Sequence, residues 1–168
     1  MREVGHFIGG KAVPGGSGRS GDVFNPNTGE VQAKVAFASK SEAEQAIANA
    51  EAAQPAWAAT NPQRRARVLF KFLELAQKEF DSLAKLLSSE HGKTIADSKG
   101  DIQRGLEVVE FACGIPHLLK GEFTEGAGPS IDLYSLRQPL GVVAGITIMW
   151  FLAPPKHCTR LPCVQPVA

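Results

Sequence analysis

Cysteine and histidine side chains, which could act as metal ligands or nucleophiles, gather near the C-terminal end of the sequence. His157 and Cys158 are adjacent, and Cys163 follows in the same short stretch. A structural metal site needs about four ligands at recognised spacings, such as paired C-x-x-C or H-x-x-x-H units. These three residues do not form such a set, so we interpret them as incidental composition and expect no metal site.

A glycine-rich segment has the letters of a dinucleotide-binding fingerprint. Residues 16–21 read Gly-Ser-Gly-Arg-Ser-Gly and match G-x-G-x-x-G. In a dinucleotide site this motif lies between a strand and a helix, so that the pyrophosphate meets the helix N-terminus. Here residues 22–26 read as an extended segment and then a turn. We therefore predict a flexible loop and no cofactor site.

An apolar run late in the chain indicates where ligand chemistry would be placed. Residues 140–148 are nearly all apolar and follow Pro139. A short run without alternation is typical of a strand that is buried on both faces, as in a parallel sheet covered by helices. Ligands of such sheets lie beyond the carboxyl ends of the strands. We therefore expect the residues that follow Thr147 to carry the chemistry.

The first helix that supports this strand is expected to begin near Lys40. Ser39 as N-cap and Glu42 three residues later form a capping box, which satisfies backbone N–H groups at the helix start. Pro55 should disturb the last turn. Small apolar residues recur at helical spacing and predict a buried face made of Ala43, Ala46, Ile47, Ala50, Ala53 and Trp57.

Further helices are marked by their caps. Asn61 precedes Pro62, which suits the first helical position, and Asp81 could cap a continuation that Gly92 ends in a left-handed conformation. Thr94, with Asp97 as its partner, opens a long helix that stops by Pro116 or Gly121. The expected buried stripes are Ala66, Leu69, Phe70, Leu73, Ala76, Phe80, Leu83, Leu86 and Leu87, and then Ile102, Leu106, Val109, Ala112 and Cys113.

Strands are expected on both sides of the helices. Residues 6–37 read as short strands and turns, and the Asn-Pro-Asn-Thr-Gly segment at 25–29 predicts a β-hairpin. Residues 121–130 read as a loop. Residues 131–137 alternate loosely and predict a strand with one wet face.

Composition limits the class of protein. The 168 residues suffice for one domain, 43% are hydrophobic, and the net charge is +1, so no footprint for nucleic acid or an anionic membrane is evident. The basic cluster Arg64, Arg65 and Arg67 reads as a solvated or paired helix face. No signal peptide or membrane-spanning run is found and the cysteines are unevenly spaced, so the cytoplasm is the expected compartment.

Several segments together resemble the N-terminal part of an aldehyde dehydrogenase. They are Phe-Asn-Pro-Asn-Thr-Gly-Glu at 24–30, Arg-Arg-Ala-Arg at 64–67, Glu-His-Gly-Lys-Thr at 90–94, the run from Gly100 to Ala112, and the run from Arg137 to Thr147. Within the superfamily, Arg-Gly-Leu-Glu-Val-Val-Glu-Phe-Ala at 104–112 most resembles the CoA-acylating methylmalonate-semialdehyde dehydrogenases.

The resemblance implies a fold, a reaction and two site residues. The fold is α/β, with a β-hairpin, several helices and a strand pair that leads into the first strand of an incomplete Rossmann-like sheet. The family oxidises methylmalonate or malonate semialdehyde with NAD and passes the acyl group to CoA, as a homo-oligomer. Arg104 matches the arginine implied in holding the substrate carboxylate, and Thr147 lies where family backbone groups approach NAD. From the residues alone, Arg104 could equally form a surface ion pair with Asp101 or Glu107.

The resemblance stops at Thr147. The family continues Pro-Phe-Asn-Phe-Pro, where the Asn serves the oxyanion hole, whereas this chain continues Ile-Met-Trp-Phe-Leu. We therefore expect residues 1–147 to be the N-terminal part of an NAD-binding domain, and residues 148–168 to be a tail outside the family that is disordered or arises from a shifted reading frame. No catalytic residue is assigned, and Cys113 reads as a buried small apolar residue.

Two functions remain open. One is a truncated semialdehyde dehydrogenase that is inactive alone and poorly soluble. The other is a non-catalytic remnant or interaction module that pairs with an intact aldehyde dehydrogenase subunit through exposed strands. A free-standing NAD-binding protein is excluded, because one strand of the nucleotide domain cannot build the crevice between strands.

Overall fold

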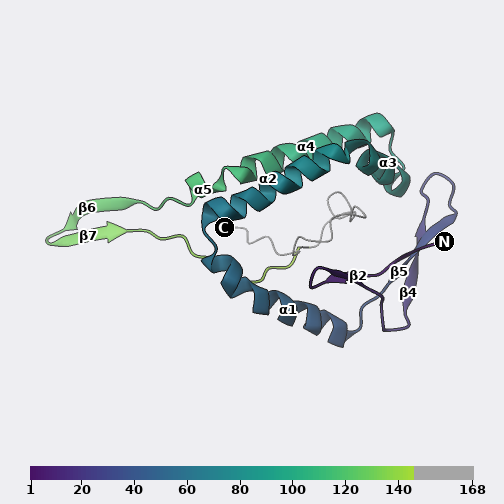
Figure 1. Cartoon of the computed structure of the whole chain (residues 1–168), viewed down its shortest axis with the longest axis horizontal. Coiled ribbons are helices and arrows are strands. Elements are labelled where there is room, and N and C mark those ends of the chain that lie inside the picture. Colours follow the sequence, from purple (N-terminus) through teal and green to yellow (C-terminus); the bar gives the residue numbers. More distant parts are fainter. Residues whose placement is uncertain (146–168) are drawn as a thin grey trace.

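The computed structural model describes residues 1–145, and these residues form a mixed α/β arrangement (Figure 1). Short strands lie at the N-terminal end, four longer helices and a short one follow, and a two-stranded hairpin projects from the far end. In chain order the elements are β1 (Arg2–Val4), β2 (His6–Ile8), β3 (Lys11–Val13), β4 (Ser20–Phe24), β5 (Val31–Ala36), α1 (Lys40–Ala59), α2 (Pro62–Lys78), α3 (Phe80–His91), α4 (Ile95–Cys113), α5 (Ile115–Leu118), β6 (Phe123–Gly128) and β7 (Ile131–Tyr134).

The N-terminal strands form two small sheets. β5 lies between β1, to which it is parallel, and β4, to which it is antiparallel, while β2 pairs with β3 as a separate hairpin. The hairpin predicted around residues 25–29 is confirmed as the β4–β5 connection. Its turn is closed by a hydrogen bond of 2.8 Å from the Gly29 N–H to the Asn25 carbonyl, and Gly29 supplies the positive φ of 72° that the turn needs.

The three-stranded sheet is joined to the C-terminal end of α3. Arg2 of β1 forms an ion pair with Glu90. The side-chain amide of Gln32 on β5 donates to the Ser89 carbonyl at 3.2 Å. These contacts bring the β4–β5 turn against the loop between α3 and α4.

The capping box predicted for α1 is confirmed, but its buried face is not. Ser39 accepts from the Glu42 N–H, and the Glu42 carboxylate accepts from the Ser39 N–H. None of the α1 residues, all within the described range, is buried, and Ile47 is 53% exposed. The small side chains at helical spacing therefore form a face that the described elements cover only in part: Ala46, Ala50 and Trp57 are half-buried, whereas Ala43, Ile47 and Ala53 are exposed. Pro55 was expected to disturb the last turn, and the helix continues through it to Ala59.

Helices α2, α3 and α4 pack together and hold most of the core (Figure 1). Asn61 caps α2 with Pro62 at its first turn, as predicted, and Gly92 ends α3 in the left-handed conformation. Two details of the prediction are wrong. Glu79, not Asp81, is the N-cap of α3, and Phe70 in the expected stripe is 55% exposed. The buried apolar residues of these helices are Ala66, Ala84, Leu87, Leu106, Val109 and Cys113.

The C-terminal part of the described chain differs most from expectation. Residues 121–130 were expected to be a loop, yet β6 occupies 123–128 and pairs with β7, as Phe123 opposite Tyr134 shows. The turn between them places Ser130 at a φ of 60°. Residues 140–145 carry no strand, because a strand is defined by a ladder and none of the described residues pairs with this segment. Residues 146–148 of the expected strand lie outside the described residues.

Candidate functional site

Arg104 lies on α4 and forms the surface ion pair that the sequence left open. Its Nη1 donates to Oδ1 of Asp101, one turn earlier, at 2.9 Å. The Arg104 side chain is 75% exposed, whereas that of Asp101 is 7% exposed. The guanidinium is therefore anchored at one nitrogen while most of it faces outward. A guanidinium carries five N–H donors, so this anchoring leaves donors for an anion.

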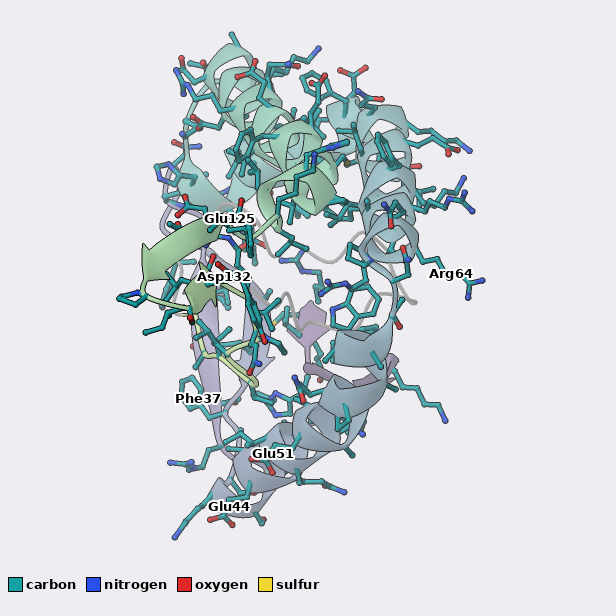
Figure 2. The ribbon with its side chains drawn as sticks, turned by 90° about the vertical axis from the view of Figure 1, so that its left-hand side faces the viewer. Phe37, Glu44, Glu51, Arg64, Glu125 and Asp132 are labelled. Carbon is teal, nitrogen blue, oxygen red and sulfur yellow. The ribbon has the colours of Figure 1, made fainter. Side chains whose placement is uncertain are left out.

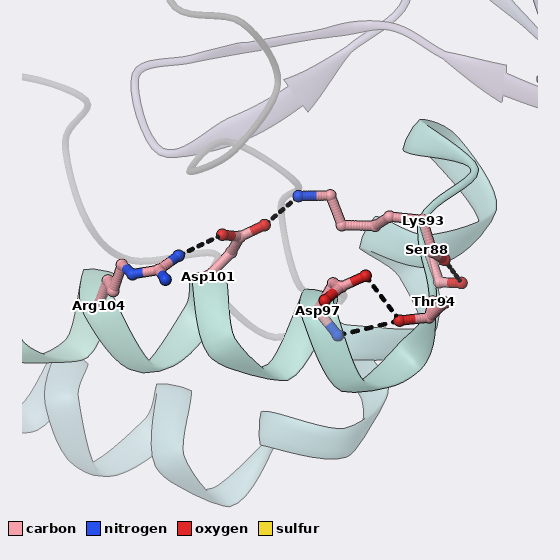
Figure 3. Close-up of polar contacts among 6 residues, drawn as sticks. All are labelled: Ser88, Lys93, Thr94, Asp97, Asp101 and Arg104. Atoms are coloured by element: carbon pink, nitrogen blue, oxygen red, sulfur yellow. Dashed lines mark hydrogen bonds and ion pairs between the residues drawn. The ribbon is translucent and has the colours of Figure 1, made fainter.

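Asp101 bridges two cations. Its Oδ2 accepts from Nζ of Lys93, whose side chain is 16% exposed. Figure 3 shows Lys93, Asp101 and Arg104 in a row along one face of α4. Both oxygens of a nearly buried carboxylate are thus paired with a charged donor, which is what a buried carboxylate requires. We call these three residues the α4 charge triad.

The loop that carries Lys93 is fixed from both sides. The Gly92 N–H donates to the Ser88 carbonyl at 2.8 Å, and the Ser88 hydroxyl donates to the Lys93 carbonyl at 2.7 Å. Thr94 then caps α4, since its hydroxyl oxygen accepts from the Asp97 N–H at 3.2 Å (Figure 3). These bonds join the end of α3 to the start of α4. They therefore fix the position of the Lys93 backbone, from which its side chain extends.

Gly92 also brings this loop against the N-terminal sheet. Its φ is 79°, and a Cβ at this position would lie 2.9 Å from Cγ of Pro26 in the β4–β5 turn. Only glycine allows both the backbone conformation and the close approach. The β4–β5 turn therefore supports the loop that positions Lys93.

The sequence named Asp101 only as a possible surface partner of Arg104 and did not single out Lys93, although a signal for the burial of Asp101 was present. Ser98, Asp101, Gly105 and Val109 recur at helical spacing, and all four are buried on α4. A carboxylate on the buried stripe of a helix needs a partner. That pattern marks Asp101 as the centre of a polar cluster, but it does not identify Lys93, which lies beyond a helix boundary.

The other candidate residues are placed as follows. Thr147, His157, Cys158 and Cys163 lie outside the described residues. Cys113 is buried on α4, as predicted, and burial raises the pKa of its thiol, an effect that the Glu110 carboxylate increases. A thiol of raised pKa is a poor nucleophile. In residues 1–145 no group of three or more His, Cys, Asp or Glu side chains is arranged to hold a metal.

The glycine motif at 16–21 leads into β4 and not into a helix, so its predicted extended context is confirmed. The Gly16 N–H donates to the Glu42 carboxylate at 2.7 Å, which fastens this loop to the start of α1. Hydrogen bonds from the Ser39 N–H, the Gly16 N–H and the Ser39 hydroxyl lower the pKa of Glu42 to about 2. The motif therefore provides a contact within the protein and does not fit a dinucleotide.

Arg64 and Arg67 of the basic cluster are exposed. Figure 2 shows the Arg64 side chain pointing away from the ribbon of α2. This agrees with a solvated helix face. Within residues 1–145, no helix has the length and apolar character that crossing a membrane requires.

Comparison with known proteins identifies relatives over most of the chain. The model of the aldehyde dehydrogenase family matches residues 13–149. The malonate-semialdehyde dehydrogenase of Pseudomonas aeruginosa is 48% identical over 147 residues, which cover 88% of this chain and 29% of that protein. The human mitochondrial methylmalonate-semialdehyde/malonate-semialdehyde dehydrogenase (acylating) is 46% identical over 140 residues, which cover 83% of this chain and 26% of that protein.

Solved structures agree with this result. A Sinorhizobium meliloti protein complexed with NAD, assigned as a methylmalonate-semialdehyde dehydrogenase, has a TM-score of 0.80 and 63% identity, covering 84% of this chain and 29% of its own. The methylmalonate-semialdehyde dehydrogenase of Oceanimonas doudoroffii has a TM-score of 0.81 and 48% identity, covering 85% and 29%. The chain thus spans less than a third of the length of these relatives, at their N-terminal end.

Proposed function

Since this chain belongs to the aldehyde dehydrogenase family, we propose that residues 1–147 form the N-terminal part of the NAD-binding domain of a CoA-acylating methylmalonate- or malonate-semialdehyde dehydrogenase. The observation that carries the proposal is the identity of 46–48% with relatives of these names over more than four fifths of the chain. The whole enzyme would oxidise the aldehyde of the semialdehyde with NAD, release the remote carboxylate as CO2 and transfer the remaining acyl group to CoA, giving propionyl-CoA or acetyl-CoA.

Arg104 is the residue of this chain that we assign to the substrate. Both semialdehydes carry a carboxylate at the end remote from the aldehyde. A guanidinium suits such a group because its planar donors match the two carboxylate oxygens. The support is geometric: Arg104 is exposed for three quarters of its side chain while one nitrogen is held by Asp101. Its role would be to orient the substrate, and it takes no part in bond making.

The described residues do not form a binding site for NAD. The glycine motif at 16–21 is followed by β4 and its first N–H is occupied by Glu42. Thr147, which the family resemblance places near the cofactor, lies outside the described residues. NAD would supply the hydride acceptor in the whole enzyme, and no step through it is assigned to residues 1–145.

We also propose that a polypeptide of these 168 residues does not turn over by itself. Cys113 is the single cysteine of the described part, and burial raises the pKa of its thiol. A thiohemiacetal requires an accessible thiolate, which this environment disfavours. Residues 1–145 therefore offer no nucleophile for this step.

A second candidate function is an interaction module that pairs with an intact aldehyde dehydrogenase subunit. The observation that favours it is the β6–β7 hairpin, where Phe123 is 66% exposed, Leu133 60% and Tyr134 70%. Sedimentation of the chain mixed with an intact relative would detect such a complex. If each protein in the mixture keeps the sedimentation coefficient that it has alone, the second function is contradicted.

The main proposal can be tested with a hybrid enzyme. Residues 1–147 of this chain would be joined to the segment of the Sinorhizobium meliloti relative that follows its matched region. NADH and acyl-CoA formation would be measured with malonate semialdehyde, NAD and CoA. We expect the hybrid to turn over and the 168-residue polypeptide to show no activity. A folded hybrid that oxidises propanal but not the semialdehydes would contradict the assigned substrate class.

A further inference from the structure

We propose that Lys93 and Asp101 are positioning residues, which set the orientation and the net charge of Arg104 so that it binds the carboxylate of the substrate. This inference rests on the proposed function and deepens it. It starts from the α4 charge triad, in which one nearly buried carboxylate joins a largely buried lysine to an exposed arginine.

The orientation comes from Asp101. An arginine on a helix surface has several rotatable bonds, and binding a ligand requires that their freedom be lost. Here Nη1 of Arg104 is already bonded to Oδ1 of Asp101 at 2.9 Å. The carboxylate itself cannot turn away, because Oδ2 is held by Lys93. Arg104 is therefore ordered before an anion arrives, while most of its side chain stays exposed.

The charge balance comes from Lys93. Arg104 and Asp101 alone would form a neutral pair, and an incoming carboxylate would meet the repulsion of Asp101 together with the attraction of Arg104. Lys93 brings the triad to a net charge of +1. Lys93 and Arg104 lie on opposite sides of Asp101 along α4 (Figure 3), and the lysine side chain is 16% exposed against 75% for the arginine, so the compensating charge does not occupy the exposed position where the ligand would bind.

The alternative is that the triad only holds the α3–α4 loop to α4. Both roles predict that substitutions lower stability, so stability cannot distinguish them. The two roles differ in how the effects of substituting Lys93 and Asp101 combine. If Lys93 acts by neutralising Asp101, removing both charges should restore carboxylate binding. If the pair is only structural, the double substitution should be at least as harmful as the single one.

The direct test uses the 168-residue chain with nitrogen-15 labelled arginine side chains and malonate as the probe. The Arg104 Nε–H signal, assigned through Arg104→Gln, would be followed during titration. We expect saturable binding in the unsubstituted chain and about threefold weaker binding in Lys93→Gln, which keeps a donor but removes the charge. The double variant Lys93→Gln/Asp101→Asn should recover to within about twofold of the unsubstituted chain.

Lys99→Gln is the matched control, since Lys99 lies on the same helix but its ion pair, at 2.7 Å, is with Asp81 and not with Asp101. It should bind malonate like the unsubstituted chain. Equal affinity in Lys93→Gln and the unsubstituted chain would overturn the inference. A double variant that binds no better than Lys93→Gln would also overturn it.

The KM values of the hybrid enzyme provide a second measurement, which can be made even if a variant of the 168-residue chain does not fold. In it, Lys93→Gln should raise the KM for malonate semialdehyde about threefold and leave the KM for propanal, which has no carboxylate, unchanged. Equal changes for both substrates would overturn the inference while the proposed function stands. An inactive hybrid, together with the expected malonate titrations, would instead contradict the proposed function.

Discussion

At the scale of single residues, the most constrained group is the Asp101 carboxylate. It is 7% exposed and carries a negative charge between two cations. The cost of taking a carboxylate out of water is offset only while both partners remain. Substituting Asp101 or Lys93 would therefore leave a buried charge of the triad without one of its partners, even though Arg104 itself faces solvent.

We predict that Asp101→Ala destabilises the chain by about 3 kcal/mol, because Lys93 would be left largely buried without its carboxylate partner. The free energy of unfolding would be measured by urea titration followed by circular dichroism. The matched control is Asp22→Ala, which removes an exposed carboxylate 3.9 Å from Lys34 and should cost less than about 0.5 kcal/mol. Similar losses of unfolding free energy in the two variants would contradict the prediction that burial makes the Asp101 ion pairs important for stability.

A second residue-scale prediction concerns the glycine that joins the α3–α4 loop to the sheet. Gly92→Ala should cost about 2 kcal/mol, because the left-handed backbone disfavours a side chain and the new Cβ meets Pro26. Gly29→Ala is the control, since Gly29 has a similar φ of 72° but an added Cβ there would meet nothing within 4 Å. It should cost about 1 kcal/mol. Urea titrations that give equal losses would show that the approach to Pro26 has no energetic weight.

At the scale of elements, the starts of α1, α2 and α4 were predictable because a side-chain cap is a local event, whereas α3 begins at Glu79 without such a cap. Ser39, Asn61 and Thr94 were identified from the sequence, and each side chain accepts the expected backbone N–H. Burial was less predictable, because it depends on which elements meet. The α1 face of small residues is only partly covered in the described structure, with no residue fully buried, whereas the stripe on α4 is covered by α2 and α3.

Strands were the least predictable elements, since a strand exists through its partner. The segment 123–128 is rich in glycine and read as a loop, yet pairing with β7 makes it a strand. The apolar segment 140–145 read as a strand but has no partner among the described residues. For the site, Arg104 was found through its family motif and local spacing. Lys93 was missed because it reaches Asp101 across the boundary between α3 and α4.

The contact between the glycine loop and α1 gives a prediction about pH. The pKa of Glu42 is lowered to about 2 in the folded chain, from 4.5, because its carboxylate accepts hydrogen bonds from Ser39 and Gly16. A carboxyl group with a lowered folded pKa stabilises the fold above its unfolded pKa, and this contribution is lost as the pH falls from about 4.5 towards 2. The unfolding free energy of Glu42→Gln should therefore approach that of the unsubstituted chain over this range. A difference that stays constant with pH, in matched urea titrations, would contradict the role of the ionised carboxylate.

At the scale of the whole molecule, the described chain has a small core and a large apolar surface. The fully enclosed positions are mostly small residues, such as Ala33 and Ala84, while many large apolar side chains are exposed. A family member about three times as long offers many more residues to cover such surfaces, as the 29% coverage of the relatives indicates.

The exposed β6–β7 hairpin leads to a prediction about solubility. The hairpin projects from the helices (Figure 1), and within residues 1–145 neither strand pairs with a third, while Phe123, Leu133 and Tyr134 are exposed. Exposed apolar strands favour association between copies. We therefore expect the 168-residue chain to self-associate, and the double variant Phe123→Ser/Leu133→Ser to shift sedimentation-velocity profiles towards the monomer. Phe70→Ser, which removes a 55% exposed aromatic ring from α2, should shift them less. If Phe70→Ser reduces self-association as much as the hairpin double variant does, the prediction is wrong. Association would then depend on the total exposed apolar surface and not on the hairpin.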